Sequence, residues 1–400
     1  MSTNPSHANY RPDIDGLRAI AVLSVVLFHG FPQLFKGGFI GVDVFFVLSG
    51  YLISRIIFEQ LNQGAFNFLD FYARRIKRIF PALLIVIVAA YIAGWFTLLA
   101  DEYGQLGQHI AAGAAFISNF VLWSEAGYFD NSAHTKPLLH LWSLGIEEQF
   151  YIVWPLLLWA ASKLRFSLFA LTLVLVALTF YLNITGIKSD AVATFYSPQT
   201  RVWELLVGSG LAWFSLYKKE GLANVAMWFG KLGARDGTTV DQVRALARIA
   251  NVLSCIGFIL LIYGLIRINR DLQFPGKWAL IPVLGTALIV AAGPRAWLNI
   301  KILSNKLLVW FGLISYPLYL WHWPIIELHR QLSTQTLSLE SSLVLLLLTF
   351  ICAVATHHLI ENPLRFSKYL AGHLKTTICL GLFAISASVL ATYVLMKGRS

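Results

Sequence analysis

The chain has 400 residues, of which 57% are hydrophobic and 13% charged. An ordinary soluble domain has roughly 25% charged residues, so the composition excludes a set of soluble domains. The formal net charge of +11 does not indicate nucleic acid, because membrane proteins concentrate Lys and Arg in their cytoplasmic loops. The cysteines Cys255, Cys352 and Cys379 lie in apolar blocks without metal or disulfide spacing, so neither kind of site is expected.

Apolar residues gather in blocks of roughly 18–22 residues, the length that a helix needs to cross a bilayer. The polar start of the chain has no basic region before a short apolar stretch, so the first block is expected to act as the targeting signal. In chain order the blocks are 14–32, 41–60, 81–99, 106–123, 140–161, 166–183, 199–217, 251–268, 278–293, 307–329, 342–361 and 376–396.

The block 106–123 is rich in Gly and Ala and is predicted not to cross. If it crossed, Lys and Arg would be nearly balanced between the two sides. If it lies at the interface or re-enters, they gather in the loops on the side of the N-terminus, as the positive-inside rule requires. We therefore predict an all-α polytopic bundle of about eleven spanning helices plus one re-entrant or interfacial segment. The N-terminus is then cytoplasmic and the C-terminus external, with the loop 124–139 outside and 218–248 inside.

The first block carries two ionisable residues, Arg18 and His29. Eleven residues make about three helical turns, so the two side chains share one face about 16 Å apart. Ionisable residues within a span are costly and by default mark a functional site. A histidine can act as a general base that deprotonates a sugar hydroxyl. The alternative is a histidine bonded to a neighbouring helix, with Arg18 reaching the interface.

With these residues the sequence resembles acyltransferase family 3, and the likeness covers about residues 10–365. Five motifs occur in the family's order. They are Asp-Gly-Leu-Arg-Ala-Ile-Ala-Val at 15–22, the spacing of Arg18 and His29, and the segments 41–50, 140–151 and 315–324.

The resemblance implies an enzyme of the bacterial inner membrane that moves an acyl group, commonly acetyl from acetyl-CoA, to a carbohydrate hydroxyl. Bacterial O-antigen acetylases, which modify lipopolysaccharide, are such relatives, and many carry an eleventh helix that leads to an external SGNH-type domain. We expect residues 1–375 to form the acyltransferase domain and 376–400 the eleventh helix and the start of an external tail. That helix is either a plain anchor or the link to an SGNH-type domain or protein. The other expected partners are the bilayer and a glycan or lipid-linked oligosaccharide acceptor, with no nucleic acid and no metal.

Arg75 and Arg78 are predicted to hold the donor together with Arg18. They lie three residues apart, hence on one helical face, and Pro81 allows a new helix to begin just after them. Guanidinium groups suit the phosphates of coenzyme A, and the family's Arg-x-x-Arg motif falls here. Plain topogenic charge beside anionic headgroups is the alternative.

Glu147 and Glu148 lie in the outer half of the predicted span 140–161. Neighbouring residues point about 100° apart on a helix, so one role for both is not expected. One is predicted to orient or polarise His29, while the other holds a neighbouring helix. His140, on the face of Glu147 at the outer mouth, is a candidate for binding substrate.

Three further candidates lie near the outer side. Asp43 is predicted to pair with a histidine or to bind a sugar hydroxyl. Ser49 is a candidate substrate-binding residue, although its hydroxyl also suits a bond to its own helix. His322 lies between two tryptophans of an aromatic belt and is a candidate of the same kind. Arg201 and Glu204, three residues apart, are predicted to form an intrahelical pair.

We expect one cavity open to the outer side, lined by His29, a glutamate and Asp43, with the three arginines at its cytoplasmic end. Coenzyme A's phosphates then stay cytoplasmic while the pantetheine arm carries the thioester into the bundle. Direct attack by a glycan hydroxyl with His29 as base is the expected path, and an acyl-histidine intermediate is the alternative. Rival classes are a secondary transporter, for which no inverted repeat is evident, an acyl-translocating protein without its own transferase activity, and a structural membrane protein.

Overall fold

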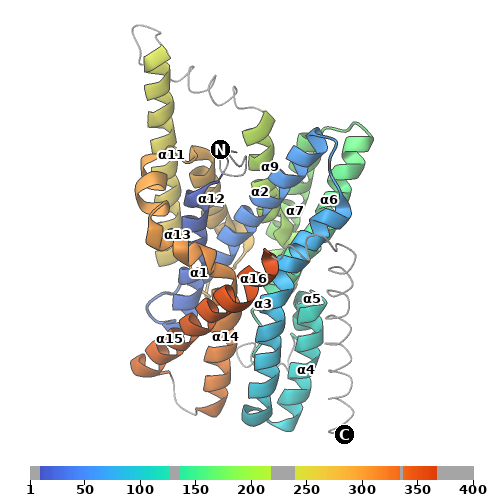
Figure 1. Ribbon diagram of the computed structural model, residues 1–400, viewed down its shortest axis with the longest axis vertical. Helices are drawn as coiled ribbons and strands as arrows, with labels where there is room; N and C mark the ends of the chain where they lie inside the picture. Colours follow the sequence, from blue (N-terminus) through green and yellow to red (C-terminus); the bar gives the residue numbers. More distant parts are fainter. Residues whose placement is uncertain (1–9, 127–135, 218–238, 334–336, 367–400) are drawn as a thin grey trace.

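The computed structural model describes residues 10–126, 136–217, 239–333 and 337–366 (Figure 1). All regular secondary structure in these ranges is helical, which agrees with the predicted all-α fold. Two short segments, η5 (Asn299–Leu303) and η6 (His357–Glu361), are π-helical. The α-helices are α1 (Pro12–Gly30), α2 (Gly41–Asn62), α3 (Phe68–Thr97), α4 (Ala100–Ala114), α5 (Ser118–Glu125), α6 (Leu141–Lys163), α7 (Leu168–Ser189), α8 (Ala191–Tyr196), α9 (Pro198–Tyr217), α11 (Thr239–Arg267), α12 (Leu280–Ala292), α13 (Lys306–Leu313), α14 (Ser315–Leu332), α15 (Leu339–Thr356) and α16 (Asn362–Arg365).

Five helical segments are long and apolar enough to cross a membrane: Gly38–Asn62, Phe68–Thr97, Leu168–Ser189, Arg244–Arg267 and Leu339–Arg365. Large apolar side chains on the outside of these helices are exposed, among them Leu173 of α7, Ile259 of α11 and Leu347 of α15. Helices that present apolar side chains outward require a lipid surrounding. The chain is therefore an integral membrane protein.

The predicted count of about eleven spans is not confirmed. Several predicted blocks are helical but carry polar groups that face the interior, such as Asp13 and Arg18 in α1 and Glu327 in α14, and these groups lower the hydropathy of the helix. Others are short or broken, because α12 has 13 residues and the block 307–329 divides into α13 and α14 at Ile314. The predicted eleventh helix and the boundary at residue 375 lie outside the described residues.

The block 106–123 divides into α4 and α5 at residues 115–117. Phe116 has a φ of 57°, a left-handed conformation that ends the helix. The two helices have 15 and 8 residues, fewer than the roughly 20 that a span needs. This agrees with the prediction that the block does not cross.

Pro81 does not begin a new helix as expected. It lies inside α3, which runs through 30 residues from Phe68. A buried face that includes Phe71 and Ala73 precedes the proline, so packing continues the helix past the missing backbone N–H. Arg75 and Arg78 are therefore held on the same rigid helix as the apolar segment that follows.

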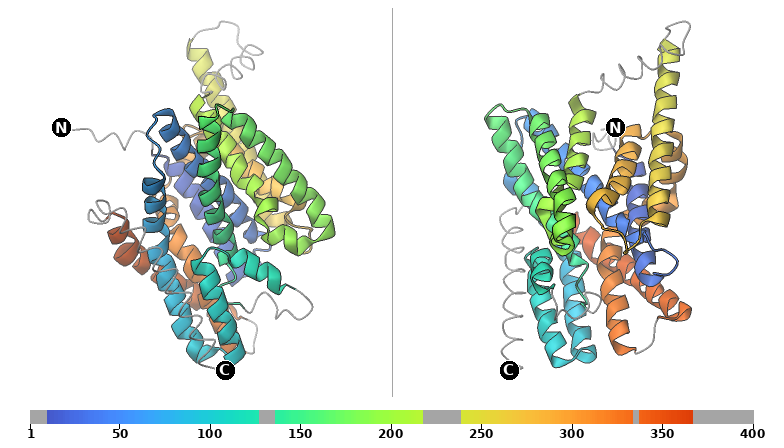
Figure 2. Two further views of the ribbon diagram at one scale, coloured as in Figure 1. Left: turned by 90° about the vertical axis from the view of Figure 1, so that its right-hand side faces the viewer. Right: turned by 180° about the vertical axis from the view of Figure 1, so that it is seen from behind.

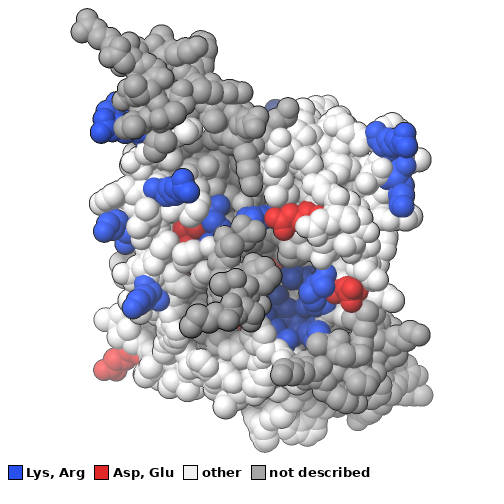
Figure 3. Space-filling model, turned by 45° about the horizontal axis from the view of Figure 1, so that its top comes forward, with Lys and Arg blue, Asp and Glu red and all other residues white. Residues whose placement is uncertain are grey.

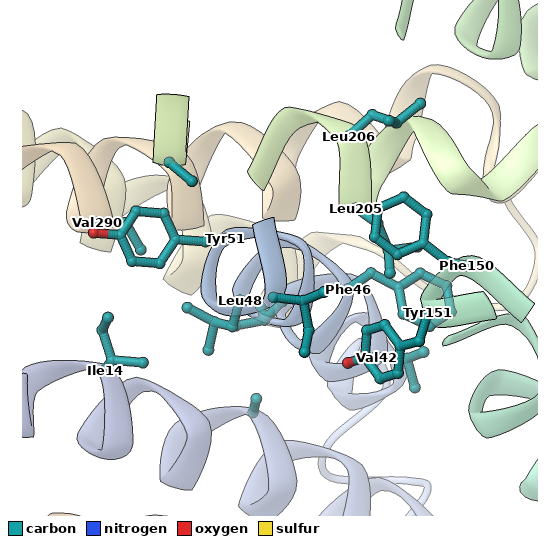
Figure 4. Close-up of a cluster of buried hydrophobic side chains, with 14 of the residues drawn as sticks. Ile14, Val42, Phe46, Leu48, Tyr51, Phe150, Tyr151, Leu205, Leu206 and Val290 are labelled. Carbon is teal, nitrogen blue, oxygen red and sulfur yellow. The ribbon is translucent and has the colours of Figure 1, made fainter. Parts of the chain in front are cut away.

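The core lies where α2 meets α6 and α9. Figure 4 shows Phe46 of α2 close to Phe150 of α6 and Leu205 of α9, whereas Tyr51 of α2 points the other way toward Val290; all belong to one cluster of buried apolar side chains. Gly50 and Gly208 allow α2 and α9 to touch, because a Cβ at either position would overlap a backbone carbonyl of the other helix. This approach brings buried polar residues of the two helices together.

Candidate functional site

Two pockets open inside the bundle, and Val42 and Tyr319 lie on the walls of both. The first, here the arginine pocket, has a volume of about 110 Å³, and its polar lining comprises Arg18, Ser49, Arg75, Arg78, Ser143, Glu147, Glu148, Tyr151, Ser315, Tyr316 and Tyr319. The second, here the histidine pocket, has a volume of about 320 Å³ and includes His29, Asp43, His140, Arg201 and Arg270 with many aromatic rings. The side chains of Val42 and Tyr319 therefore lie between the two groups of predicted site residues.

The structure brings the three predicted arginines together in the arginine pocket. Arg18 comes from α1 and forms an ion pair of 3.3 Å with Asp15, while Arg75 lies 6.0 Å from the centre of the Tyr151 ring. Arg78 follows one helical turn after Arg75. Figure 3 shows Lys and Arg side chains gathered in a hollow on the face at the top of the bundle. A cluster of guanidinium groups around a recess has the chemistry to bind a polyanion.

Sequence reasoning missed a fourth arginine of this cluster, Arg365. It ends α16, and its charge acts on Arg18, Arg75 and Arg78. Its nearest carboxylate is Glu361, with an N–O distance of 3.8 Å. The only signal in the sequence was its spacing of four residues from Glu361, which also describes an ordinary helical pair.

The two glutamates do not lie beside His29 as expected but in the arginine pocket. Ser49 donates a hydrogen bond of 2.5 Å to Oε1 of Glu147, so the serine does not bond its own helix. Glu148 faces the charge of Arg75, and its Oε1 has no hydrogen-bond partner in the described residues. The reason is helix rotation and depth: α6 turns both carboxyl groups into the arginine pocket, Glu147 toward Ser49 of α2 and Glu148 toward Arg75 of α3.

His29 has another histidine as its hydrogen-bond partner. Its Nδ1 lies 3.1 Å from Nε2 of His322, and Nδ1 of His322 lies 2.5 Å from the carbonyl oxygen of Tyr319. Since a carbonyl only accepts, His322 carries its proton on Nδ1 and, when neutral, accepts at Nε2. His29 then donates from Nδ1 and keeps the lone pair on Nε2, for which the described part of the chain supplies no hydrogen-bond partner. This tautomer is the one that a general base requires.

His140 and Tyr319 complete the junction between the pockets. The Tyr319 hydroxyl donates to the carbonyl oxygen of His140 at 2.8 Å and lies 2.6 Å from the hydroxyl of Ser143. The His140 ring centre lies 5.6 Å from that of His322. The predicted candidates His140 and His322 are thus beside His29, and Tyr319 is a residue that the sequence analysis did not single out.

Asp43 lies in the histidine pocket but does not pair with a histidine. It accepts a hydrogen bond of 3.0 Å from Arg201, which also forms an ion pair of 3.3 Å with Glu204. The predicted pair of Arg201 and Glu204 is confirmed, and Asp43 of α2 extends it to a second helix. Asp43 is drawn away from His29 because the buried guanidinium requires it as a counter-charge.

Residues outside the spanning helices fix the position of Trp323, which packs behind His29. Trp323 packs edge-on against His29 with ring centres 4.6 Å apart and donates a hydrogen bond to the carbonyl oxygen of Lys136. The ammonium of Lys136 lies 2.9 Å from Glu125, and His109 lies 3.1 Å from the same oxygen. Burial alone would raise the pKa of Glu125, but the hydrogen bonds from His109 and Lys136 outweigh it and lower this pKa to about 2. Glu125 therefore stays ionised over the physiological pH range and holds Lys136, in the segment that leads into α6, by an ion pair.

Arg270 contributes a positive charge to the wall of the histidine pocket. It precedes α12 in the loop after α11, and its guanidinium lies 4.7 Å from the centre of the Phe28 ring. Burial and the nearby charge of Arg330 lower the pKa of Arg270.

Fold and site together define a membrane-embedded helical protein in which a cationic pocket and a histidine pocket meet inside the bundle. The family model described as an acyltransferase domain matches residues 11–358. The chain belongs to this family, acyltransferase family 3, as the sequence motifs predicted.

Relatives with curated names have the same character. The chain is 32% identical over 376 residues to the peptidoglycan O-acetyltransferase OatA of Listeria monocytogenes, covering 91% of this chain and 57% of the relative. It is also 32% identical over 420 residues to the putative peptidoglycan O-acetyltransferase YrhL of Bacillus subtilis, covering 100% of this chain and 63% of the relative. The chain thus spans about three fifths of these relatives. No solved structure matches it significantly.

Proposed function

We propose that the protein transfers an acyl group, acetyl in the first instance, from acyl-CoA to a hydroxyl of a cell-surface glycan. One observation carries the proposal: the arginine pocket and the histidine pocket share Tyr319 and Val42, so a donor and an acceptor bound in them meet inside the bundle. Family membership supports the acyl transfer. The names of the relatives favour peptidoglycan as the acceptor over the lipopolysaccharide O-antigen that the sequence motifs predict.

The donor end is assigned to the arginine pocket at the cytoplasmic face. Arg18, Arg75 and Arg78 suit the phosphates of coenzyme A, because guanidinium forks bind phosphate oxygens bidentately. Arg18 and His29 lie on one face of α1 about 16 Å apart, a distance that an extended pantetheine arm can cover. We place the protein in the bacterial inner membrane with its N-terminus in the cytoplasm, where acyl-CoA is available.

The chemistry assigned to the junction is general-base transfer. Nε2 of His29 takes the proton of the acceptor hydroxyl, and the oxygen attacks the thioester carbonyl carbon. The carbon–sulfur bond then breaks, and the leaving thiolate takes the proton from Nε2 of His29 and departs as free coenzyme A, which restores the neutral histidine. His322 holds the required tautomer of His29. An acyl-histidine intermediate would use the same lone pair as the nucleophile.

The test is replacement of His29 by glutamine in the full chain, purified and returned to liposomes with acetyl-CoA and a glycan acceptor. Loss of a general base lowers the rate by roughly 10²–10⁴-fold, measured as acetylated glycan by mass spectrometry and as released thiol. His358→Gln is the matched control, because this histidine is exposed on η6 and lines neither pocket. Normal glycan acetylation by the His29 variant, with the control unchanged, overturns the assignment.

A further inference from the structure

Proton transfer at His29 does not require the aromatic side of the histidine pocket. There the guanidinium of Arg201 lies among four aromatic rings: 5.5 Å from Phe46, 5.6 Å from Trp142, 5.7 Å from Phe195 and 5.6 Å from Phe274. Of these rings, Trp142, Phe195 and Phe274 also line the pocket, as does Arg201 itself. A pocket lined by aromatic side chains with a few fixed polar atoms is typical of a ligand-binding site.

The hydrogen bonds of Arg201 are incomplete. Nη2 bonds Asp43, but Nε, which lies 3.3 Å from Glu204, and Nη1 have no hydrogen-bond partner among the described residues, although the side chain is fully buried. A guanidinium presents five N–H donors, and a buried donor left unpaired is costly. Because Arg201 lines the pocket, an acceptor oxygen of a bound molecule that reaches Nη1 would satisfy this N–H group.

The charges around the pocket indicate that this oxygen is uncharged. Two carboxylates, Asp43 and Glu204, already face the single guanidinium of Arg201. A carboxylate or phosphate bound at Nη1 would meet their negative charge at short range.

We propose that this part of the histidine pocket binds the ring of one uncharged pyranose of the acceptor. The C–H faces of the sugar pack on Trp142 and Phe195, and a hydroxyl or acetamido oxygen accepts a hydrogen bond from Nη1 of Arg201. The volume of about 320 Å³ is at the small end of ligand pockets and suits one ring rather than a chain. The proposal rests on the proposed function, because the bound sugar is the one whose hydroxyl reaches His29.

The test measures sugar binding without acyl transfer. The full chain is placed in lipid nanodiscs free of glycoside detergent, without acyl-CoA, and N-acetylglucosamine binding is followed by saturation-transfer NMR. Phe195→Leu, which removes one ring face but keeps an apolar side chain, is expected to weaken binding at least tenfold. The control Phe350→Leu changes a ring that packs on Trp310 and lines neither pocket, and it is expected to bind as the wild type does. Glucuronate at the same concentration is expected to give no signal.

Three results overturn the proposal: no binding of N-acetylglucosamine to the wild type, equal binding of glucuronate, or an unchanged affinity in Phe195→Leu. Because binding is measured without donor, its outcome is independent of catalysis. A protein that acetylates glycan through His29 but shows any of these results retains the proposed function and loses only the pyranose site. If the His29→Gln variant binds the sugar and also acetylates glycan normally, the assignment of His29 as general base is wrong, whereas the pyranose site is retained.

Discussion

At the scale of single residues, the contact between His29 and His322 is the most consequential one. His322 accepts the Nδ1 proton of His29 only because its own Nδ1 is bound to the carbonyl of Tyr319. Phenylalanine at position 322 keeps a ring in the packing but removes the acceptor, so kcat is expected to fall roughly 10²-fold. The KM for acetyl-CoA is expected to stay unchanged, because the donor is assigned to the other pocket.

A second variant separates positioning from packing. His322→Asn supplies an amide oxygen that can accept the Nδ1 proton of His29, so steady-state assays should show more activity than in His322→Phe. Equal activity of the two variants would contradict the tautomer argument. A raised KM for acetyl-CoA in either would place His322 in the donor site instead.

Arg365 leads to a prediction about the donor. With its charge beside Arg18 and Arg78, Arg365→Gln is expected to raise the KM for acetyl-CoA about three- to tenfold without changing kcat, the effect of losing about 1 kcal/mol of binding. Lys163→Gln, an exposed cation at the end of α6, is the control and should leave KM unchanged. A thioester of pantetheine without phosphates should be used equally by the wild type and Arg365→Gln; a loss with this donor too would show that Arg365 does not bind phosphate.

The residue types of the site could be predicted from the sequence, but their neighbours could not. Charged and histidine residues inside apolar blocks are costly, which singled out Arg18, His29 and Glu147. Which side chain meets His29 depends on the rotation of α14 against α1, and His322 lies 293 positions away in the chain. Glu147 was expected at the depth of His29 for the same reason, because the sequence does not fix the tilt of α6.

At the scale of helices, the contact of α2 with α9 decides whether the ion cluster of Asp43 and Arg201 forms. A methyl group at Gly208 would overlap the carbonyl oxygen of Val47, so Gly208→Ala is expected to lower the free energy of unfolding by about 1–3 kcal/mol. Gly210→Ala is the matched control, since nothing lies within 4 Å of a Cβ there, and it should be neutral or stabilising. Thermal unfolding in detergent measures both, and equal midpoints would contradict a tight contact at Gly208.

Helices as such could be predicted from apolar blocks, whereas their breaks and lengths could not. For the block 106–123, the small residues and the charge bias predicted only that the block does not cross the membrane, and not that it divides at Phe116. Pro81 predicted the start of a new helix, yet α3 continues through it. The free-energy cost of one proline is small compared with the packing energy of a 30-residue helix. The break at Ile314 has a local signal that the sequence analysis did not use: Gly312 precedes it, and Pro317 lacks the N–H that would bond the carbonyl of Leu313.

At the scale of the whole molecule, the proposed reaction requires that the two pockets face opposite sides of the membrane. One end of the bundle, toward the top of Figure 1, holds the start of α3 and the junction of α6 with α7. The junction of α3 with α4 lies at the opposite end, and the turned views in Figure 2 agree. The arginine pocket takes Arg75 and Arg78 from the first part of α3, whereas His29 lies at the last turn of α1. The proposed donor site and acceptor site therefore lie toward opposite ends of the helices.

This sidedness gives the last prediction. In a chain whose native cysteines are replaced, a single cysteine at Arg165, in the turn before α7, should react with a membrane-impermeant maleimide only in inverted vesicles. A cysteine at Leu99, in the turn before α4, should react only in right-side-out vesicles. Both side chains are exposed, so labelling reports the side of the membrane rather than burial. Labelling from the opposite sides would place the arginine pocket outside, away from acyl-CoA, and would contradict both the positive-inside assignment and the proposed direction of acyl transfer.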